Sequence, residues 1–246
     1  MRAREVLLAL CVVLVSAGAI HAQDKNLFFA KKNSFSLKAG YHIFNRSEYT
    51  DFWLVDQKDY GGPAAEIAYE RELIRSLGLE IALGFYRGNQ GYSYSNLVFV
   101  GDSARLDTTL SNTYLSLSLK PHFPIGNRFQ LYFGAGADLC YTLANFAGSY
   151  LRGSSAVSFD ETQSTLSVGV HGMGGIEYLF WKTTNRAAEF DMPVSVFLEY
   201  KYSYVPVKNF DKRVIDHINS LTGSAVSAHQ MDVGGQMAFI GLRWRF

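Results

Sequence analysis

Histidine, serine and acidic residues often carry out hydrolysis, and two short stretches of the 246-residue sequence combine them. Ser47 and Glu48 follow His42, and residues 217–220 contain His, Asn and Ser. A nucleophile needs a base within hydrogen-bond reach, and that base needs a third group to orient it. Neither stretch has a spacing typical of this arrangement, so we do not expect the protein to be an enzyme.

Four acidic residues lie in polar stretches where a metal ion would have access: Asp102, Asp107, Asp160 and Glu161. They are scattered and lack the ligand spacing that a cation needs, so we expect solvated charges and no metal site. Cys140 is the sole cysteine after residue 22, which excludes a disulfide within that part of the chain. We expect it to be a small packed residue, and we expect no cofactor.

The composition favours strands and turns over helices. The 23 Lys and Arg residues nearly balance the 22 Asp and Glu residues, so a net charge of +1 gives no indication of a nucleic-acid partner. Fifteen Tyr and eighteen Phe, with 22 Gly and only five Pro, are typical of a chain built from strands.

The N-terminal residues have the three parts of a secretory signal peptide. Charged residues at 2–5 precede an apolar run over 6–20, and Ala22 supplies a small residue for cleavage. We therefore expect residues 1–22 to be a signal peptide, with a retained anchor helix as the alternative, and residues 23–246 to form one domain. No later run approaches the roughly twenty apolar residues of a transmembrane helix.

Alternation of apolar with small or polar residues is the main pattern after the signal peptide. Such a period of two predicts strands with one apolar face and one polar face. About eight strands are expected, over residues 34–43, 66–70, 77–86, 115–120, 129–141, 166–180, 194–203 and 231–246.

The connections between these strands alternate in length. Long connections are expected at 45–60, 92–109, 147–163 and 205–229, short ones at 72–76 and 121–127, and an intermediate one at 181–192. Short links on one rim and long links on the other are typical of an all-β, antiparallel, up-and-down transmembrane barrel with periplasmic turns and extracellular loops.

A secreted lipocalin-like barrel, with the apolar face inside, is the alternative. The polar face favours the membrane barrel, because it mixes Gly, Ala and Ser with single charges, as an enclosed interior requires. Aromatic residues also gather in two belts on the apolar face, as they do at the two membrane interfaces. The belts are Phe129, Tyr178, Phe180, Trp244 and Phe246 on the short-turn side, and Tyr41, Phe85, Tyr141 and Tyr202 on the other.

The inward face is predicted to carry a network of paired charges. Eight strands enclose an interior just wide enough for side chains, where isolated charges are very costly and paired ones are accommodated. The predicted lumen network is Lys38, Glu66, Glu70, Glu80, Lys120, Asp138, His171, Glu177, Glu199, Lys201 and Arg243, with His42 and Gln236 on the same face. We expect Arg243 to face Glu80 or Glu177.

The last eight residues, FIGLRWRF, place Ile240, Leu242, Trp244 and Phe246 on one face. With this ending, residues 23–246 resemble the small outer-membrane β-barrel family, the eight-stranded group that includes outer-membrane protein X and the transmembrane domain of outer-membrane protein A. The resemblance implies that these four residues form the C-terminal insertion signal read by the barrel assembly machinery. It also implies a location in the outer membrane of a Gram-negative-type envelope, in contact with lipid and lipopolysaccharide.

A structural or adhesion-type surface role is the function we expect first, with the lumen plugged by ion pairs. Apolar and aromatic residues in the connections 45–60 and 92–109 favour an extracellular ligand there, although the same stretches would also suit strands that extend above the membrane and pack together. A narrow channel or a binding site for small or hydrophobic solutes is the alternative, and enzymatic modification of lipid A comes third.

Overall fold

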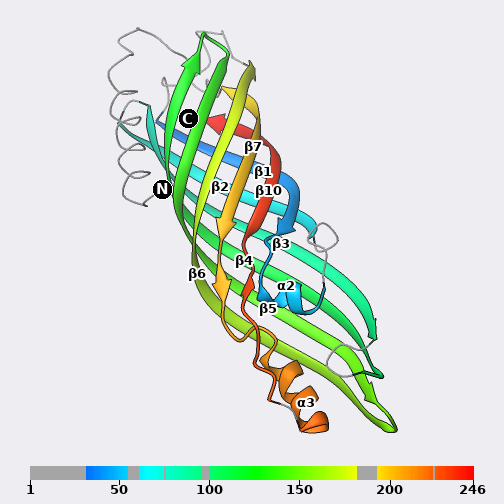
Figure 1. Cartoon of the computed structure of the whole chain (residues 1–246). Coiled ribbons are helices and arrows are strands. Elements are labelled where there is room, and N and C mark those ends of the chain that lie inside the picture. The colour runs from blue at the N-terminus through cyan, green and yellow to red at the C-terminus, as the bar shows by residue number, and fades with distance from the viewer. Residues whose placement is uncertain (1–31, 55–60, 75, 96–99, 182–192, 224) are drawn as a thin grey trace, which may run out of the picture.

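Eight antiparallel strands close into a barrel in the computed structural model, which describes residues 32–54, 61–74, 76–95, 100–181, 193–223 and 225–246 (Figure 1). Their order around the barrel is β1-β10-β7-β6-β5-β4-β3-β2, so each strand pairs with its sequence neighbours among the eight. The bounds are β1 Asn33–Phe44, β2 Gly61–Ile74, β3 Leu77–Ser95, β4 Asp102–Ile125, β5 Phe129–Arg152, β6 Ser155–Trp181, β7 Val194–Tyr204 and β10 Gly235–Arg245. The predicted eight-stranded, up-and-down barrel is confirmed, whereas the predicted signal peptide at 1–22 lies outside the described residues.

The barrel closes where the last strand meets the first. In the β1–β10 register Phe35 lies opposite Trp244. At the end of this seam the backbone N–H of Phe246 donates to the carbonyl of Asn33 (2.9 Å), and the N–H of Asn33 donates to the carbonyl of Phe246 (3.2 Å). The final aromatic residue is therefore held at a closed edge, where no strand is left with open hydrogen-bonding groups.

Four of the strands are much longer than the others. β3, β4, β5 and β6 have 19, 24, 24 and 27 residues, whereas β1, β2, β7 and β10 have 12, 14, 11 and 11. The long strands continue past one rim of the closed barrel as a curved four-stranded sheet (Figure 1). We call this sheet the extension, and it comprises residues 87–95, 102–111, 143–152 and 155–164.

Two of the connections expected to be long are mainly strand. β3 runs to Ser95 and β4 begins at Asp102, and β5 and β6 are joined by a tight turn in which Gly153 has a φ of 58°. The prediction of a loop at 147–163 was therefore wrong. Its serines, threonines and acids suggested a loop, but an outward strand face in water also requires polar residues.

A cap fills the concave side of the extension. It consists of residues 45–54 and the described part of 205–234, which include the helices α2 (Glu48–Phe52) and α3 (Lys212–Thr222) and the two-residue strands β8 (Pro206–Val207) and β9 (Met231–Asp232). Ser47 caps α2 through a reciprocal hydrogen-bond pair with Thr50, and α3 ends at Gly223 in the left-handed conformation. Neither described helix is long and apolar enough to cross a bilayer.

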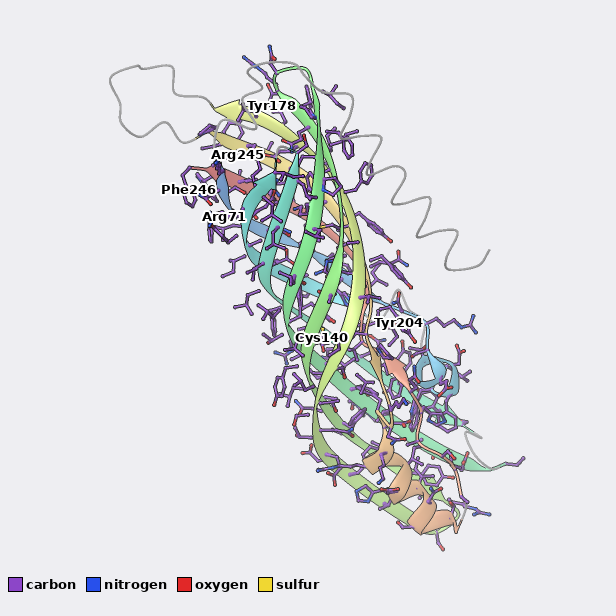
Figure 2. All side chains as sticks on the ribbon, turned by 90° about the vertical axis from the view of Figure 1, so that its left-hand side faces the viewer. Arg71, Cys140, Tyr178, Tyr204, Arg245 and Phe246 are labelled. Atoms are coloured by element: carbon purple, nitrogen blue, oxygen red, sulfur yellow. The ribbon has the colours of Figure 1, made fainter. Side chains whose placement is uncertain are left out.

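The polarity of the strands inverts at the rim where the extension begins. Along β4 the closed barrel buries Lys120 and Ser118 and exposes leucines at 115, 117 and 119. In the extension the same strand buries Leu110 and Leu106, while Thr109 faces outward beside Asn89, to which its hydroxyl donates (3.1 Å). Side chains project from both faces along the whole length of the ribbon, and Cys140 lies near the level of this change (Figure 2).

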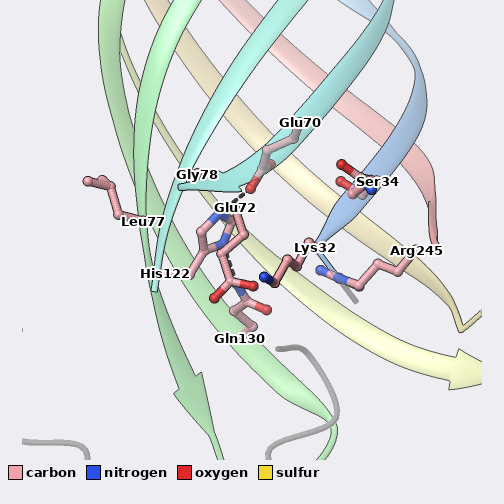
Figure 3. A pocket seen from close by; sticks show the side chains of 10 residues that line it. Lys32, Ser34, Glu70, Glu72, Leu77, Gly78, His122, Gln130 and Arg245 are labelled. Atoms are coloured by element: carbon pink, nitrogen blue, oxygen red, sulfur yellow. Dashed lines mark hydrogen bonds and ion pairs between the residues drawn. The ribbon is translucent and has the colours of Figure 1, made fainter. Parts of the chain in front are cut away.

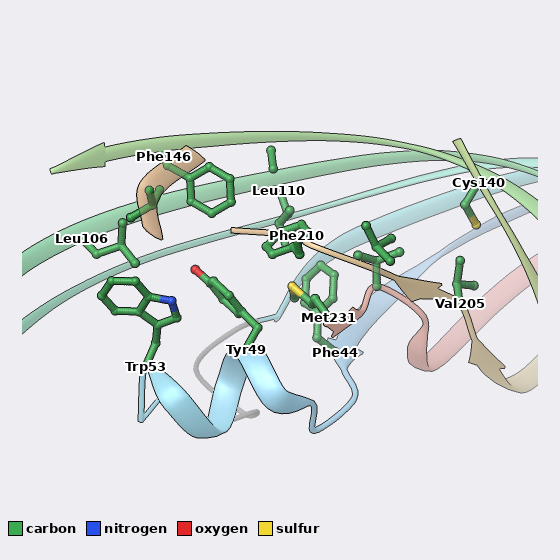
Figure 4. Close-up of a cluster of buried hydrophobic side chains, with 14 of the residues drawn as sticks. Phe44, Tyr49, Trp53, Leu106, Leu110, Cys140, Phe146, Val205, Phe210 and Met231 are labelled. Carbon is green, nitrogen blue, oxygen red and sulfur yellow. The ribbon is translucent and has the colours of Figure 1, made fainter. Parts of the chain in front are cut away.

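The main hydrophobic cluster consequently lies between the cap and the extension. Trp53 and Tyr49 of the cap point from α2 toward Leu106 and Phe146 of the extension (Figure 4). The other large buried members include Phe44, Leu110, Tyr150, Phe159, Phe210, Val214, Ile215, Ile218, Met231 and Val233. This cluster holds the two helices against the sheet by burying apolar surface that would otherwise face water.

Candidate functional site

The interior of the closed barrel holds one connected network of charged side chains. Ion pairs of 4 Å or less join thirteen groups, namely Lys38, Glu66, Glu70, Glu80, Lys120, His122, Asp138, His171, Glu177, Glu199, Lys201, Arg243 and Arg245. All eleven residues of the predicted lumen network are among them. The structure thus brings together charges that are up to 205 positions apart in the sequence, from Lys38 to Arg243.

Lys38 lies at the centre of this network. Its Nζ is 2.5 Å from Oε1 of Glu66, 2.7 Å from Oε1 of Glu199 and 3.4 Å from Oε1 of Glu80. The lysine side chain is fully buried. A buried cation of this kind is tolerated because three carboxylates from three other strands surround it.

Lys120 and Arg243 extend the network toward the short-turn rim. Lys120 is 2.7 Å from Glu80, and its ammonium lies over the ring of Tyr132 at 4.3 Å. Arg243 is 2.8 Å from Glu177 and 3.9 Å from Glu80, so it contacts both of the partners predicted for it.

Lys201 and His171 extend the network toward the extension. Lys201 is 3.2 Å from Oδ1 of Asp138 and 3.6 Å from Oε2 of Glu66. Nδ1 of His171 is 2.9 Å from Oδ1 of Asp138, and its Nε2 is 2.8 Å from the hydroxyl of Ser118. Beyond this level most inward groups are aromatic or aliphatic, so the connected network of ion pairs ends where the apolar cluster starts.

Two members of the network were missed by sequence reasoning, and one predicted inward residue was wrong. His122 follows Lys120, and Arg245 follows Arg243, at the spacing of two that places each pair on one face. Both lie near strand ends. His122 lies in the stretch 121–127 that was interpreted as a turn, and Arg245 lies within the C-terminal insertion signal. Gln236 shares its face with Ile240, and it faces outward, where its side-chain oxygen accepts a hydrogen bond from Tyr200 (3.1 Å).

A small pocket lies at the short-turn mouth of the barrel, below the network (Figure 3). It has a volume of about 30 Å³, which is room for one or two water molecules. Its lining includes Lys32, Glu70, His122, Gln130 and Arg245. His122 connects this pocket to the network, because its Nε2 is 2.5 Å from Oε1 of Glu70.

The residues considered for catalysis are not assembled into a catalytic arrangement. His42 is buried inside the barrel, stacked on Tyr86 at 3.9 Å, with Nε2 3.2 Å from the carbonyl oxygen of Gly234. Ser47 is used in capping α2, and the hydroxyl of Ser220 donates to the backbone carbonyl of His217 (2.7 Å).

The acidic residues considered for metal binding have other contacts. Asp102 accepts a hydrogen bond from the hydroxyl of Tyr150 (2.6 Å), and Glu161 is bound by two residues of α3. Among the described residues, no group of three or more His, Cys, Asp or Glu side chains is arranged to hold a metal ion. Cys140 is buried, as expected for a packed residue.

Asp211 joins the two parts of the cap. Its carboxylate accepts hydrogen bonds from Nε1 of Trp53 (3.0 Å) and from the backbone N–H of His229 (2.7 Å), and it lies 2.7 Å from Nδ1 of His229. The ring of His229 in turn stacks on Phe52 at 4.1 Å. A single buried carboxylate therefore connects α2, the start of α3 and the segment before β9.

Helix α3 is also attached to β6 through Glu161. The carboxylate is 3.0 Å from Nη1 of Arg213 and 3.2 Å from Nε2 of His217. Hydrogen bonds from His217 and Arg213 lower the pKa of Glu161 below its ordinary value. Arg213 also donates to the backbone carbonyl of Thr162 (3.2 Å), so α3 covers part of the β6 edge that no described strand pairs with.

Tyr49 shows how completely the cap excludes water. It is fully buried, and its hydroxyl is 3.0 Å from that of Thr108 in the extension. Burial raises the pKa of Tyr49 well above its ordinary value. The tyrosine acts as a neutral hydrogen-bonding group within the apolar cluster.

An exposed apolar band, a closed antiparallel barrel and a buried charged interior define an integral outer-membrane β-barrel. The sequence matches the family of the outer membrane protein beta-barrel domain over residues 7–246, and the chain belongs to that family. The protein is therefore located in the outer membrane, with the short turns on the periplasmic side and the extension and cap on the extracellular side. None of the curated proteins compared matches the sequence.

Solved structures of small outer-membrane proteins are similar to the chain at low identity. Neisserial surface protein A is 15% identical, with 87% of this chain and 96% of that chain covered and a TM-score of 0.49. OprG from Pseudomonas aeruginosa is 13% identical, with 88% and 97% covered and a TM-score of 0.43. Ail, the attachment invasion locus protein of Yersinia pestis, is 14% identical in its complex with a heparin analogue, with 88% and 99% covered and a TM-score of 0.41.

Proposed function

We propose that the protein is a closed barrel that acts at the cell surface by presenting its folded cap and extension to an extracellular partner, in an adhesion-type role. The proposal rests on one observation: side chains fill the interior of the molecule at two successive levels. Buried ion pairs occupy the membrane level, and buried aromatic side chains occupy the level above it. A barrel built in this way is suited to hold a rigid extracellular structure in place.

Closure to solutes is tested by recording currents across planar bilayers that contain the refolded full chain. We expect no steady unit conductance, because Lys38, Lys120 and Arg243 are held by carboxylates on several sides. A conducting porin in the same bilayers is the positive control. Large and steady unit currents would contradict the proposal and support the alternative, a narrow channel for small solutes.

The extracellular contact is proposed to use the connections at 45–60 and 92–109, as the sequence suggested, and to involve only those of their apolar side chains that are exposed. Trp53 and Tyr94 are buried in the cluster, whereas Leu54 is 76% exposed and Val100 is 98% exposed. The exposed pair offers apolar surface to a partner without unfolding the cap. Val55, Tyr60 and residues 97–99 were also considered for this contact, and they lie outside the described residues.

The matched experiment compares Leu54→Ser/Val100→Ser with Leu73→Ser/Ile74→Ser, whose side chains are exposed at the opposite, periplasmic rim. Cells that display each variant are tested for adherence to immobilised matrix proteins and glycans. We expect the first pair of substitutions to reduce adherence severalfold and the second to leave it unchanged. Equal adherence of both variants would contradict a contact through this surface.

The outer surface of the barrel supports a proposal on lipid contact and assembly. The exposed apolar band is proposed to face membrane lipid, with lipopolysaccharide beside the extension. Ile240, Leu242, Trp244 and Phe246 are proposed to be read by the barrel assembly machinery. Removal of Phe246 should slow insertion more than Phe35→Ala, which truncates an exposed aromatic on the pairing strand; equal insertion rates for the two variants would contradict the signal.

Modification of lipid A is not part of the proposed function. His42 faces the interior and is fully buried, so its imidazole has no access to a lipid substrate from this position. Mass spectrometry of lipid A from expressing cells should show an unchanged acyl pattern. A changed pattern that disappears with His42→Ala would support the enzymatic alternative.

A further inference from the structure

The outer face of the barrel carries an exposed arginine, Arg71, at its periplasmic rim. Arg71 of β2 lies directly opposite Asn33 of β1, and both side chains are on the outward side of their strands. Figure 2 shows Arg71 and Phe246 at the same end of the barrel. The side chain of Arg71 forms no ion pair or hydrogen bond with any of the described residues. Its guanidinium is therefore available to an anionic group from outside the chain.

Asn33 offers a second donor beside Arg71. The hydroxyl of Tyr69 donates to Oδ1 of Asn33 at 2.7 Å, which uses the amide oxygen and leaves Nδ2 as the donor. The backbone of Asn33 is fixed as well, because it exchanges two hydrogen bonds with Phe246 at the closing seam. Directly opposite residues of paired strands have Cβ atoms about 5 Å apart. One charged and one neutral donor therefore lie side by side, an arrangement that suits the two free oxygens of a phosphodiester.

The outward residues beyond this pair change in kind with depth. The next row toward the middle of the membrane is aromatic, and the row after it is aliphatic. These rows consist of Phe35, Tyr69 and Trp244, and of Leu37, Ile67 and Leu242, paired across β10, β1 and β2. Ala39 and Ala65, which pair with each other, follow. A phospholipid has the same order from the membrane surface inward, with a charged headgroup, an interfacial glycerol and apolar acyl chains.

The length of this surface matches one leaflet of a bilayer. Ala65 precedes Arg71 by six positions on β2, which is about 20 Å along a strand. At a strand tilt of roughly 40°, this distance is about 15 Å of membrane depth. A hydrocarbon core is roughly 30 Å thick, so the surface reaches its middle. A lipid of the periplasmic leaflet is therefore the occupant that fits both the charge and the depth.

We propose that this surface of β1 and β2 is a binding site for an anionic phospholipid of the periplasmic leaflet. Arg71 and Nδ2 of Asn33 donate to the phosphodiester, Tyr69 borders the glycerol, and an acyl chain lies along Leu37 and Ile67, which are both 45% exposed. An anionic headgroup is favoured over a zwitterionic one, because the latter carries a cation of its own. The inference rests on the proposed contact of the apolar band with lipid, and it names the class of lipid bound.

Arg128 provides a matched control at the same rim. It precedes β5, and its side chain is exposed like that of Arg71. One nitrogen of its guanidinium is already used, because Nη1 donates to the hydroxyl of Tyr178 at 3.3 Å. Substitution of either arginine by glutamine removes the same charge from the periplasmic rim. A difference between the two variants therefore measures the site, and an equal effect measures general electrostatic attraction.

Native mass spectrometry of the refolded full chain in detergent tests the proposal. Phosphatidylglycerol and phosphatidylcholine with identical acyl chains are titrated separately. We expect the wild type to retain phosphatidylglycerol at a severalfold lower concentration, Arg71→Gln to lose this preference, and Arg128→Gln to keep most of it. Arg71→Lys should lie between the wild type and Arg71→Gln, because lysine keeps the charge but lacks the planar fork of donors. Heat-modifiable migration verifies that each variant is folded.

Four results would contradict the proposal. Equal losses of phosphatidylglycerol in Arg71→Gln and Arg128→Gln would overturn the site in favour of general attraction to the rim. Equal retention of both lipids by the wild type would overturn the site but leave the lipid contact of the apolar band intact, whereas retention of neither would contradict both. Excess inorganic phosphate should not displace the lipid, because it has no acyl chain to contact Leu37 and Ile67; full displacement would show a phosphate site and no lipid site.

Discussion

The closed barrel and the extension are built from the same strands but have opposite polarity. Along β4, Lys120 faces inward in the closed barrel, and Leu110 faces inward in the extension. The backbone pattern is continuous through both regions, and only the surroundings change. Lipid outside requires an apolar outer face, whereas water outside requires a polar one, so the medium determines which kind of residue faces inward.

The two regions are therefore stabilised by different interactions. In the extension, Phe146 and Trp53 are removed from water, so the hydrophobic effect stabilises the cap. In the closed barrel, the outward leucines exchange one apolar environment for another, so they contribute little to the free energy of folding. The specific part of its stability comes from backbone pairing and from a charged network in which every member depends on its partners.

The largest effect is expected from Lys38→Met in the closed barrel. Methionine keeps most of the side-chain volume but leaves Glu66, Glu80 and Glu199 without their shared cation. Removing one partner from a buried ion pair costs about 3 to 5 kcal/mol. Urea unfolding in lipid vesicles measures the loss. The matched control is Leu37→Met on the lipid-facing side of the same strand, which should change stability little, and equal effects of the two variants would contradict the distinction between inner and outer faces.

A comparable but local effect is expected from Phe146→Ala in the extension. The phenyl ring is fully buried against Tyr49 and Phe210, and truncating such a ring costs about 3 kcal/mol. Hydrogen exchange should show faster exchange in α2 and α3, with β1 and β10 unchanged. If the whole barrel lost its protection from hydrogen exchange together with the cap, the closed barrel and the extension would unfold as one cooperative unit. The difference between the two regions would then be contradicted.

Much of the closed barrel was predictable from the sequence because its alternation is strict. A period of two fixes which side each residue faces, so the eleven predicted network residues, including Arg243, all lie inside. Gln236 was assigned to the wrong face although its position, four residues before Ile240, already required the lipid side. That error came from giving residue type more weight than register.

The extension and the cap were less predictable for a physical reason. Polar residues outside the membrane suit both a solvated loop and the outer face of a strand, so residues 147–163 gave no distinguishing pattern. Contacts such as Trp53 with Asp211 join connections 158 positions apart, and no local spacing indicates them. His122 was missed because the prolines and Gly126 around it suggested a turn, although its spacing from Lys120 placed it on the inner face.

A moderate effect is expected from Trp53→Phe in the cap. The substitution removes the hydrogen bond from Nε1 to the carboxylate of Asp211, which is worth about 1.5 kcal/mol for a charged acceptor, while most of the ring packing remains. The expected result is faster exchange in α2 and at the start of α3. Trp244→Phe, on the outer face of β10, is the control and should leave exchange in the cap unchanged. Adding Asp211→Asn to Trp53→Phe should cost less than the sum of the two changes, because both act on one contact; strict additivity would contradict the link.

The smallest effect is expected from acidification, which should loosen α3 before it affects the closed barrel. Hydrogen bonds from His217 and Arg213 lower the pKa of Glu161, so its contribution is complete at neutral pH and is lost as the pH falls through the lowered pKa. Between pH 7 and about pH 3.5, we expect exchange in α3 to rise after correction for the intrinsic rate, with less change in Glu161→Gln.

Salt distinguishes this contact from those inside the barrel. The pair between Glu161 and Arg213 is partly exposed, with side chains that are 27% and 58% exposed, so high salt at neutral pH should partly reproduce the effect of acid on α3. The pairs of Lys38 are fully buried, and mobile ions have no access to them. If high salt weakened the closed barrel as much as α3, water and ions would reach the membrane-level network, and the charged interior would not be sealed.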